Sequence, residues 1–488
     1  MEMKTAVSIL EWVYAHLRFS DVVLALSVLF LLSCLREKLS NKAGPMSWPV
    51  LGILPSLIVH RNDLFDWCTG ALAKAGGTFH YRGVWFGGSY GIMTVDPVNI
   101  EYILKTNFKN YPKGEFYRER FRDLLEDGIF NADDELWKEE RRVAKMEMHS
   151  ARFSDHSYAT MRDLVKEELL TLMEKMASSG KSFDLQDVLL RFTFDNICGA
   201  AFGVDPGSLA IDLPEIPFAK AFEEATEYTL IRFLLPPFVW KPMRFLGIGH
   251  EKKLRKAVRI VHVFADKTLE RFFRSQYFSD KYFREFCTSF IIAGRDTTSV
   301  ALVWFFWLIQ THPEVEKKIL TEIRQVRNKT RDFFDPQELK EMVYLQAALT
   351  ESLRLYPSVP MEMKQAQEDD VLPDGTKLKK GARIHYSIYS MGRMESIWGK
   401  DCGEFKPERW IEDGNKLRMQ NQFKYAVFNA GPRLCVGKKF AYMQMKMVAA
   451  SILMNYSIKL VHGQDIVPKL TTTLYMKNGL MVKLEPRV

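Results

Sequence analysis

The segment 281–310 constrains the fold more than any other part of this 488-residue chain. Its apolar side chains, among them Ile291, Ala301 and Phe305, surround the helix axis instead of forming one stripe. A helix that is apolar on every side is buried in the middle of a large domain. Further helical patterns are found at about 134–150, 157–177, 186–202, 215–230, 250–273, 343–356 and 436–453. Short strands are expected at 78–82 and 89–95, in the stretch from 357 to 390, and near the C-terminus. The chain is therefore predicted to be mainly α with small β-sheets.

The N-terminal region carries a candidate membrane anchor. The run from Val22 to Leu35 has no charged residue. Extended back to Phe19 it has 17 residues, interrupted only by Asp21, which is at the short end of the range for a bilayer span. A signal peptide is the alternative, but Arg36, Lys38 and Lys42 follow the run and resemble a stop-transfer flank. Prolines and glycines then form a stiff connector. We expect an anchor at 1–36, a basic Pro-rich hinge at 37–56 and one catalytic body at 57–488.

Composition and missing motifs exclude several classes of protein. The net charge is 68 − 60 = +8, a mild excess that does not favour nucleic-acid binding. Six cysteines without a C-x-x-C pair indicate neither a disulfide scaffold nor a zinc site. Residues 87–91 fit G-x-S-x-G, but the residues after Ser89 predict a strand, whereas a serine hydrolase needs a helix there. Walker A, G-x-G-x-x-G and H-E-x-x-H motifs do not occur.

The strongest chemical signal is the segment 428–437, FNAGPRLCVG. A Gly-Pro loop delivers Cys435 to the start of a predicted helix, where free N–H groups and the helix dipole stabilise a thiolate. Arg433 adds a cation that can bind a carboxylate, and Gly431 and Gly437 remove bulk so that a flat group can approach. A single thiolate in such surroundings suits an axial haem ligand.

This segment resembles the haem-binding loop F-x-x-G-x-R-x-C-x-G of the cytochrome P-450 monooxygenases, with every fixed position present. The resemblance implies that Cys435 ligates the iron of haem b and that Phe428, Arg433 and Gly437 line the haem. Trp137 and Arg141 resemble the family's W-x-x-x-R, which implies contacts to a haem propionate.

Two further motifs support the resemblance. Glu351 and Arg354 match E-x-x-R, and Arg409 lies in a P-E-R-W element. In the family these three residues form a buried charge network behind the haem.

The segment 293–298 matches A/G-G-x-D/E-T-T/S and interrupts the apolar helix. By resemblance Thr297 and Asp296 handle protons during dioxygen activation, and the helix loosens near Gly294. Two structural alternatives stay open: Gly294 allows close helix packing, and Thr297 bonds back to the carbonyl of Ala293.

The region around 386–399, the haem loop and the tail 472–479 look like the plant fatty-acid ω-hydroxylase clan of this superfamily. The clan's layout implies a substrate pocket that draws on residues near 113–127 and on Phe290, Ala293, Val359, Met361 and Leu474. One departure concerns 271–280, where the clan usually has some twenty more residues. A haem-binding but inactive shortened isoform, and a hydroxylase of another lipophilic substrate such as an alkane, are the alternatives.

The resemblance therefore implies an NADPH- and O2-dependent ω-hydroxylase of long- or very-long-chain fatty acids. The chain has no flavin or nicotinamide motif, so its electrons are expected from a partner, the membrane-bound NADPH reductase. A basic face for that partner is expected at Arg141, Arg142, Lys145, Lys438 and Lys439. The expected location is the endoplasmic reticulum membrane, with one membrane pass and the catalytic domain in the cytosol.

Overall fold

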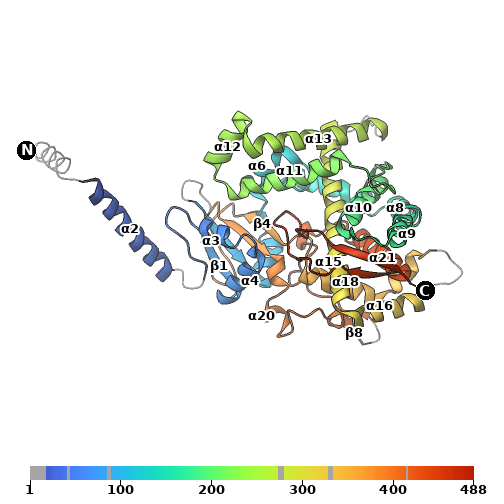
Figure 1. Cartoon of the computed structure of the whole chain (residues 1–488). Helices are drawn as coiled ribbons and strands as arrows, with labels where there is room; N and C mark the ends of the chain where they lie inside the picture. Colours follow the sequence, from blue (N-terminus) through green and yellow to red (C-terminus); the bar gives the residue numbers. More distant parts are fainter. Residues whose placement is uncertain are drawn as a thin grey trace, which may run out of the picture.

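The computed structural model describes residues 18–40, 44–84, 90–272, 280–327, 333–413 and 416–487 (Figure 1). Helices make up most of the described chain, and the strands form four small sheets. This confirms the prediction of a mainly α fold with small β-sheets. The connection expected to be shortened, 271–280, lies almost wholly outside the described residues.

The central helix of the body is built from three consecutive pieces. These are α14 (Asp280–Ile291), a π-helical turn η5 (Ile292–Asp296) and α15 (Thr297–Thr311). Trp304 and Phe305 of α15 are fully buried. The helices packed against α15 are α10 (Leu185–Phe202), α18 (Val343–Leu355), α21 (Lys438–Asn455) and α16 (Pro313–Val326). The helix lies in the interior because its apolar side chains leave no face that could remain in water.

The larger sheet lies at the end of the body nearest the N-terminus (Figure 1). Its strand order is β1 (Thr78–Arg82), β2 (Tyr90–Thr94), β7 (Arg383–Ser387) and β4 (Met361–Gln365). The antiparallel pairing of β1 with β2 confirms the predicted strands. Residues 87–89 of the G-x-S-x-G motif lie outside the described residues, but a strand and not a helix begins at Tyr90, as the sequence predicted.

The other described elements complete the body. The helices are α3 (Leu54–Val59), α4 (Leu64–Lys74), α5 (Pro97–Glu101), α6 (Gly114–Leu125), α7 (Asp134–Met148), α8 (Ala151–Asp163), α9 (Leu170–Ser179), α11 (Pro217–Leu234), α12 (Pro237–Leu246), α13 (Gly249–Phe272), α17 (Pro336–Glu341), α19 (Ile388–Met391) and α20 (Glu395–Trp398). Shorter helical turns are η2 (Tyr102–Thr106), η3 (Phe108–Asn110), η4 (Leu164–Leu169), η6 (Pro407–Trp410) and η7 (Gly431–Arg433). A second sheet joins β10 (Tyr456–Leu460), β11 (Met481–Pro486) and β3 (Phe183–Asp184), and two hairpins pair β5 (Asp370–Val371) with β6 (Lys377–Leu378) and β8 (Ile411–Glu412) with β9 (Lys416–Leu417).

The helices that the sequence patterns missed include α6 and α12. Helix α6 is rich in charged residues, and α12 contains Pro237 and Pro242, which usually limit a helix. Their positions are fixed by tertiary packing, since α6 contacts α11 and β4, and α12 contacts α13.

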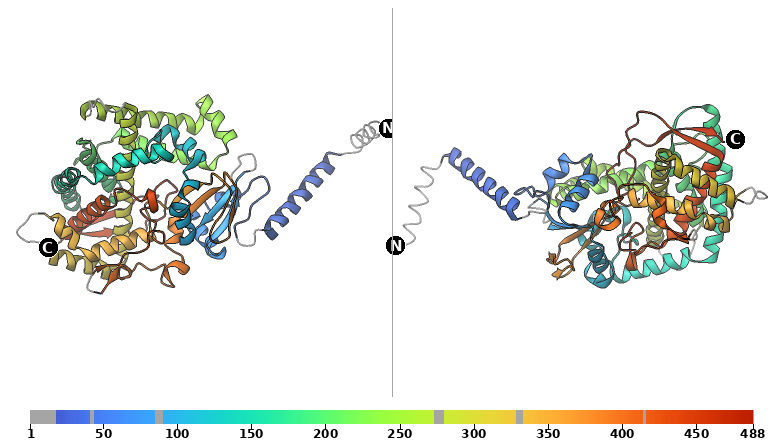
Figure 2. Two further views of the ribbon diagram at one scale, coloured as in Figure 1. Left: turned by 180° about the vertical axis from the view of Figure 1, so that it is seen from behind. Right: turned by 90° about the horizontal axis from the view of Figure 1, so that it is seen from below.

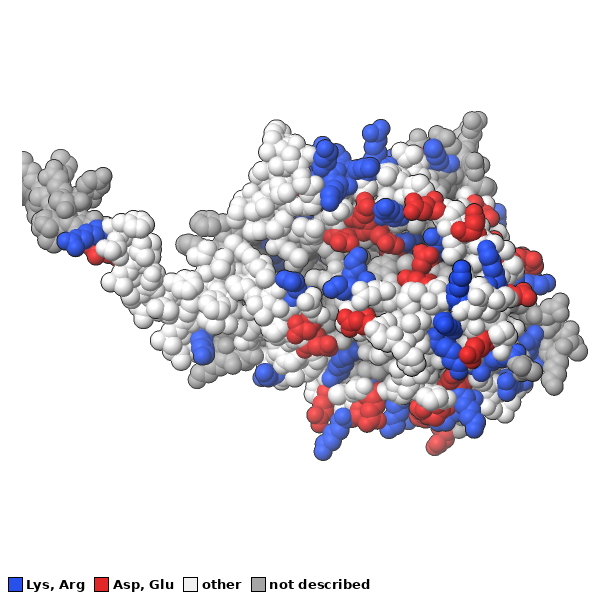
Figure 3. Space-filling view, in the orientation of Figure 1, with Lys and Arg blue, Asp and Glu red and all other residues white. Residues whose placement is uncertain are grey.

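The apolar N-terminal helix α2 (Phe19–Ser40) projects from the body as a separate rod (Figures 1 and 2). Its window Phe19–Arg36 has a mean hydropathy of 1.9, and none of it is buried. The central helix also passes this test over Lys281–Thr311, but 72% of that window is buried, as expected for a core helix. The middle of α2, from Val22 to Leu35, has no charged side chain, whereas charges of both signs cover the visible face of the body (Figure 3). Helix α2 is therefore a candidate membrane anchor.

The C-terminal part of the expected hinge is hydrogen-bonded to the larger sheet. Trp48 and Gly52 exchange two backbone hydrogen bonds, and the N–H of Ile53 donates to the carbonyl of Arg82 at 2.7 Å. Gly52 has a φ of +57°, and a Cβ there would lie 2.3 Å from the Arg82 oxygen. Glycine is required at this position, which fixes where the connector meets the body.

Candidate active site

A cavity opens between the central helix, α7 and the loop that precedes α21. Its lining is mostly apolar and includes residues from each of these elements. All six residues that the family resemblance assigned to the haem line this cavity: Trp137, Arg141, Phe428, Arg433, Cys435 and Gly437. The fold thus brings together residues almost 300 positions apart in the chain.

Backbone conformation shapes the loop that carries Cys435. Asn429 and Gly431 both have positive φ, +60° and +61°. A Cβ at residue 431 would lie 2.3 Å from the carbonyl oxygen of Leu104, so only glycine fits. The N–H of Cys435 donates to the carbonyl of Phe428 at 2.8 Å, which closes the loop. Cys435 therefore lies two residues before the N-cap of α21, Gly437.

The thiol of Cys435 lies deep in the protein but is exposed to the cavity. Its exposed surface faces the cavity, although the residue is otherwise enclosed by the protein. Burial raises the pKa of the thiol, whereas the Gly437 N–H and the nearby charges of Arg141 and Lys438 lower it. The Gly437 N–H, Arg141 and Lys438 all favour the charged form of the sulfur, and such groups stabilise a cysteine thiolate that acts as a metal ligand.

Two arginines and a tryptophan form one side of the cavity. The guanidinium carbons of Arg433 and Arg141 lie 4.5 and 5.7 Å from the ring centroid of Trp137. Arg433 donates to a carboxylate oxygen of Asp133 at 2.8 Å, and Arg141 donates to the carbonyl of Leu434 at 2.5 Å. The Nε of Arg433 is buried and has no hydrogen-bond partner among the described residues. These cations retain donors for an anionic ligand.

The sequence analysis missed a second group of cations beside Arg433. Lys113 lines the cavity and pairs with Glu362 at 2.6 Å. Lys364 is fully buried on β4, and its Nζ has no partner in the described chain. Burial, followed by the charges of Arg433 and Lys113, lowers the pKa of Lys364 far below its usual value. A single lysine in a strand matches no sequence motif. Its place in the site therefore becomes clear only from its neighbours in the folded chain.

These residues fit a haem. The thiol of Cys435 offers one iron ligand, and the glycines clear space for a flat ring. The buried Nε of Arg433 and Nζ of Lys364 have no acceptor among the described residues, and propionate carboxylates would supply acceptors.

The central helix presents Ala293, Gly294 and Thr297 to the cavity. These residues lie in or beside the π-helical turn η5, so the helix is locally widened as the motif implied. The hydroxyl of Thr297 donates to the carbonyl of Ala293 at 2.6 Å. A Cβ on Gly294 would lie 2.6 Å from a side-chain carbon of Ile197 on α10. The close packing at Gly294, the hydrogen bond from Thr297 to Ala293 and the widened turn are therefore all present in this segment.

Asp296 points away from the cavity lining and into a buried charge cluster. Arg295 donates to its carboxylate at 2.8 Å and also pairs with Glu223 of α11 at 3.0 Å. Burial raises the pKa of Asp296, while the positive charge of Arg295 opposes that rise. Asp296 is thus adjacent to Thr297 in the chain but separated from the cavity by its own helix.

The predicted substrate residues divide into two groups. Phe290, Ala293 and Val359 line the cavity. Met361 and Leu474 are not among the described residues that line it, and Leu474 instead accepts a hydrogen bond from the indole of Trp304. Additional apolar lining comes from Ile129, Phe130, Ala301, Val427 and Phe440.

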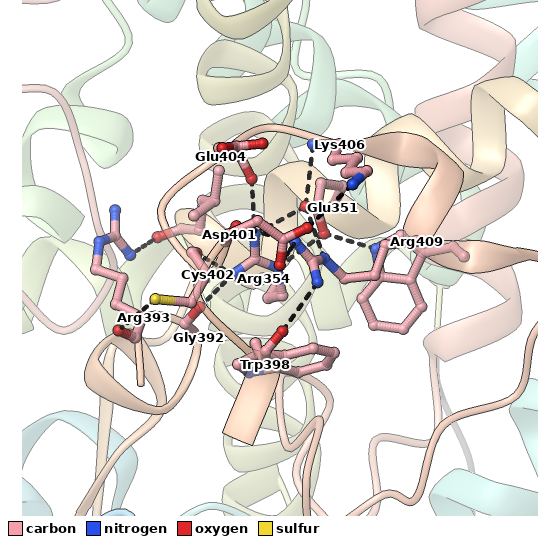
Figure 4. A network of polar contacts seen from close by, with 12 residues as sticks. Glu351, Arg354, Gly392, Arg393, Trp398, Asp401, Cys402, Glu404, Lys406 and Arg409 are labelled. Carbon is pink, nitrogen blue, oxygen red and sulfur yellow. Dashed lines mark hydrogen bonds and ion pairs between the residues drawn. The ribbon is translucent and has the colours of Figure 1, made fainter. Parts of the chain in front are cut away.

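The three predicted network residues meet behind the cavity (Figure 4). Glu351 is fully buried and receives two hydrogen bonds from Arg354 at 2.8 Å. Arg409 lies 3.3 Å from the same carboxylate, and the indole of Trp410 donates to it at 2.7 Å. Arg354 in turn donates to the carbonyls of Gly392, Cys402 and Glu404. The network ties α18 to the loop ahead of η6.

The sequence matches the family model described as Cytochrome P450 over residues 43–277 and 272–485. The two matches meet at the connection that was expected to be shortened. The chain is 48% identical to Cytochrome P450 86B1 of Arabidopsis thaliana, over 95% of this chain and 89% of that protein. It is 36% identical to Alkane hydroxylase MAH1 of the same organism, over 94% of this chain and 97% of that protein. It is 35% identical to Noroxomaritidine synthase 1 of Narcissus pseudonarcissus, over 99% of both chains.

Proposed function

The chain belongs to the cytochrome P450 family of haem-thiolate monooxygenases, and on this premise we propose that it hydroxylates the terminal carbon of long- or very-long-chain fatty acids. The observation that carries the proposal is the position of Cys435, whose sulfur faces an apolar cavity from the loop ahead of α21.

The proposed haem site follows from the residues around that sulfur. Cys435 would hold the iron, and Trp137, Arg141, Arg433 and Lys364 would hold the propionates. When bound, the haem supplies the activation of dioxygen, with one oxygen atom entering the substrate and the other leaving as water.

On the opposite wall, Thr297 is proposed to hold a proton at its hydroxyl, and the widened turn η5 leaves room beside it. Asp296 is proposed to take up protons from the solvent side, because Arg295 holds its carboxylate next to that of Glu223, whose side chain is 47% exposed. This gives the two residues of the motif separate positions in one proton path.

The substrate proposal rests on the apolar lining and on the sequence likeness to the plant ω-hydroxylase clan. Phe290, Ala293 and Val359 are proposed to guide a hydrocarbon chain towards Cys435. A terminal C–H bond is stronger than an internal one, so the pocket must present the methyl end alone. An alkane is the second candidate substrate, because the relative MAH1 is named an alkane hydroxylase.

The electrons are proposed to come from NADPH through a separate reductase. Arg142, Lys145 and Lys439 are exposed near the Cys435 loop, whereas Arg141 and Lys438 are partly buried. The exposed cations would form a basic face for an acidic partner. We further propose one membrane pass through α2 in the endoplasmic reticulum, with the body in the cytosol, since α2 is apolar and unburied.

The primary test is Cys435→Ala, with Cys34→Ala in the anchor helix as the matched control. The Cys435 variant should lose the Soret band that the unmutated chain gives after reduction and CO treatment, and the control should keep it. A band of unchanged position in the Cys435 variant would refute the ligand assignment.

A second test addresses activity. The purified chain, supplied with NADPH reductase and oxygen, should convert hexadecanoic acid to its ω-hydroxy product, detected by mass spectrometry. A protein with the thiolate band but no product from acids or alkanes would instead support the alternative of an inactive shortened isoform.

A further inference from the structure

The short connection between α18 and β4, residues 356–360, forms part of the cavity wall. Ser358 and Val359 line the cavity, and Ser358 is only 7% exposed. Pro357 and Pro360 flank these two residues, and each proline fixes its own φ and has no N–H to donate. The backbone of the connection is therefore stiff, and the fold sets the direction of the Ser358 side chain.

Ser358 contacts the central helix at the residue that follows the widened turn. Its hydroxyl donates to the backbone carbonyl of Thr297 at 2.6 Å, its only acceptor among the described residues. In an α-helix the same carbonyl also accepts the N–H four residues further on, so it takes part in two hydrogen bonds. Thr297 is the first residue of α15 after η5, where the wide turn returns to regular helix. The extra bond therefore holds the helix at this boundary, next to the Thr297 side chain.

The carbonyl of Ser358 is bound as well, and it connects the cavity wall to the C-terminal segment 472–476. The N–H of Leu474 donates to it at 2.9 Å. The carbonyl of Leu474 in turn accepts the indole N–H of Trp304 at 2.6 Å, and Trp304 lies on α15 about two turns after Thr297. The three hydrogen bonds thus leave α15 at Thr297, pass through Ser358 and Leu474, and return to α15 at Trp304.

Packing and burial protect these three hydrogen bonds from water. Leu474 and Trp304 are both fully buried. The indole ring of Trp304 stacks on the phenol ring of Tyr356, which belongs to the same connection as Ser358, with the ring centroids 4.0 Å apart and the planes 4° apart. Water cannot replace a partner that is lost in such a place, so each bond restrains the two segments that it joins.

We propose that Ser358 is a positioning residue for oxygen insertion, because its hydroxyl fixes Thr297 and Val359 relative to each other. This inference rests on the proposed function, in which Thr297 holds a proton and Val359 guides the substrate chain. The bond makes the proton and the substrate meet at one place in the cavity. Without it the two walls would move independently. Two electrons from NADPH and two protons would then more often convert O2 to H2O2, with no oxygen atom entering the substrate.

The experiment compares three variants of the full-length holoenzyme. Ser358→Ala removes the hydroxyl but keeps the carbonyl that binds Leu474, and Ser358→Thr keeps a hydroxyl. Ser157→Ala is the matched control, because it also removes a buried hydroxyl, one that donates within α8 to the carbonyl of Ser154 at 3.1 Å. Amide hydrogen exchange without substrate, followed by mass spectrometry, should become several-fold faster in segments 294–301 and 472–476 in Ser358→Ala only.

A second measurement supplies NADPH reductase, oxygen and hexadecanoic acid and records the molar ratio of H2O2 to ω-hydroxy product. Ser358→Ala should raise this ratio about two- to tenfold, the range that the loss of one hydrogen bond gives. Ser358→Thr and Ser157→Ala should stay within about twofold of the unmutated enzyme, since neither loses the bond to Thr297.

Unchanged hydrogen exchange or an unchanged peroxide ratio in Ser358→Ala would overturn the positioning role, and so would equal changes in Ser358→Thr. In that case an unmutated enzyme that still forms ω-hydroxy acid would leave the proposed function standing. An unmutated enzyme that forms no product but shows the expected exchange pattern in the variants would refute the function and keep the role of Ser358 in holding the two segments.

Discussion

The pH dependence of stability offers a sharp test of one buried carboxyl group. Glu140 lies on α7 beside the cavity-lining Arg141 and is only 3% exposed. Burial, reinforced by the charges of Glu285 on α14 and of Glu139, raises its pKa from the ordinary 4.5 to about 7. Glu285 is itself buried and accepts a hydrogen bond from the backbone of Asp127 at 3.0 Å. Deprotonation would therefore place two like charges between α7 and α14.

The sign of the effect follows from proton binding. Below about pH 4.5 Glu140 is protonated in both the folded and unfolded states, so it costs nothing. Between pH 4.5 and 7 the unfolded chain releases the proton while the folded chain keeps it, so stability falls as the pH rises. Above pH 7 the loss levels off at about 2.5 pKa units, or about 3 kcal/mol.

The perturbation is Glu140→Gln, which keeps the shape of the side chain and removes the titration. The variant should exceed the unmutated chain in stability by about 1 kcal/mol at pH 5 and by about 3 kcal/mol at pH 8. Thermal unfolding followed by circular dichroism at several pH values measures this as a difference in midpoint that widens with pH. Glu135→Gln is the matched control, because Glu135 is exposed on the same helix, pairs with Lys138 at 2.5 Å and is not among the charges that raise the pKa of Glu140. A difference that stays constant with pH, or a less stable Glu140 variant at pH 8, would refute the reasoning.

Three further outcomes are expected. Glu351→Gln should lower the free energy of unfolding by about 3 kcal/mol or more, because the new amide group would face the donors of Arg354 and Trp410 inside a buried network. Denaturant unfolding measures this loss, with the exposed Glu412→Gln as control. A loss below about 1 kcal/mol, similar to that of the control, would contradict the prediction. Thr297→Ala should raise NADPH use per product formed, and unchanged coupling would argue against its proton role. Deletion of residues 1–42 should move the protein from the membrane fraction to the soluble fraction, and a body that stays bound must carry a second membrane surface.

Several parts of the site could be predicted from the sequence because their chemistry is local. The loop 428–437 needs left-handed backbone at Gly431 and a cysteine before a helix, and both requirements leave a contiguous trace in the sequence. The interruption of an apolar helix at Gly294 likewise marks the widened turn η5. Lys364 was missed, because a single lysine on a strand is unremarkable until Arg433 is placed beside it.

The direction of Asp296 also depended on its neighbours. The motif places it next to Thr297, but the packing of α11 brings Glu223 to Arg295, and this ion pair holds Asp296 away from the cavity. Met361 and Leu474 were predicted in the pocket from family layout, and strand pairing and the Trp304 contact place them outside the described lining.

The family, the sulfur that faces the cavity and the buried central helix could be predicted from the residues alone, since each depends on residues adjacent in the chain or repeated at a helical period. Which charges meet is visible only in the folded chain. The guanidinium carbons of Arg120 and Arg383 both lie within 3.3 Å of the Phe116 ring centroid, although the two arginines are more than 250 positions apart. Electrostatic effects depend on distance and burial, and both are properties of the folded chain.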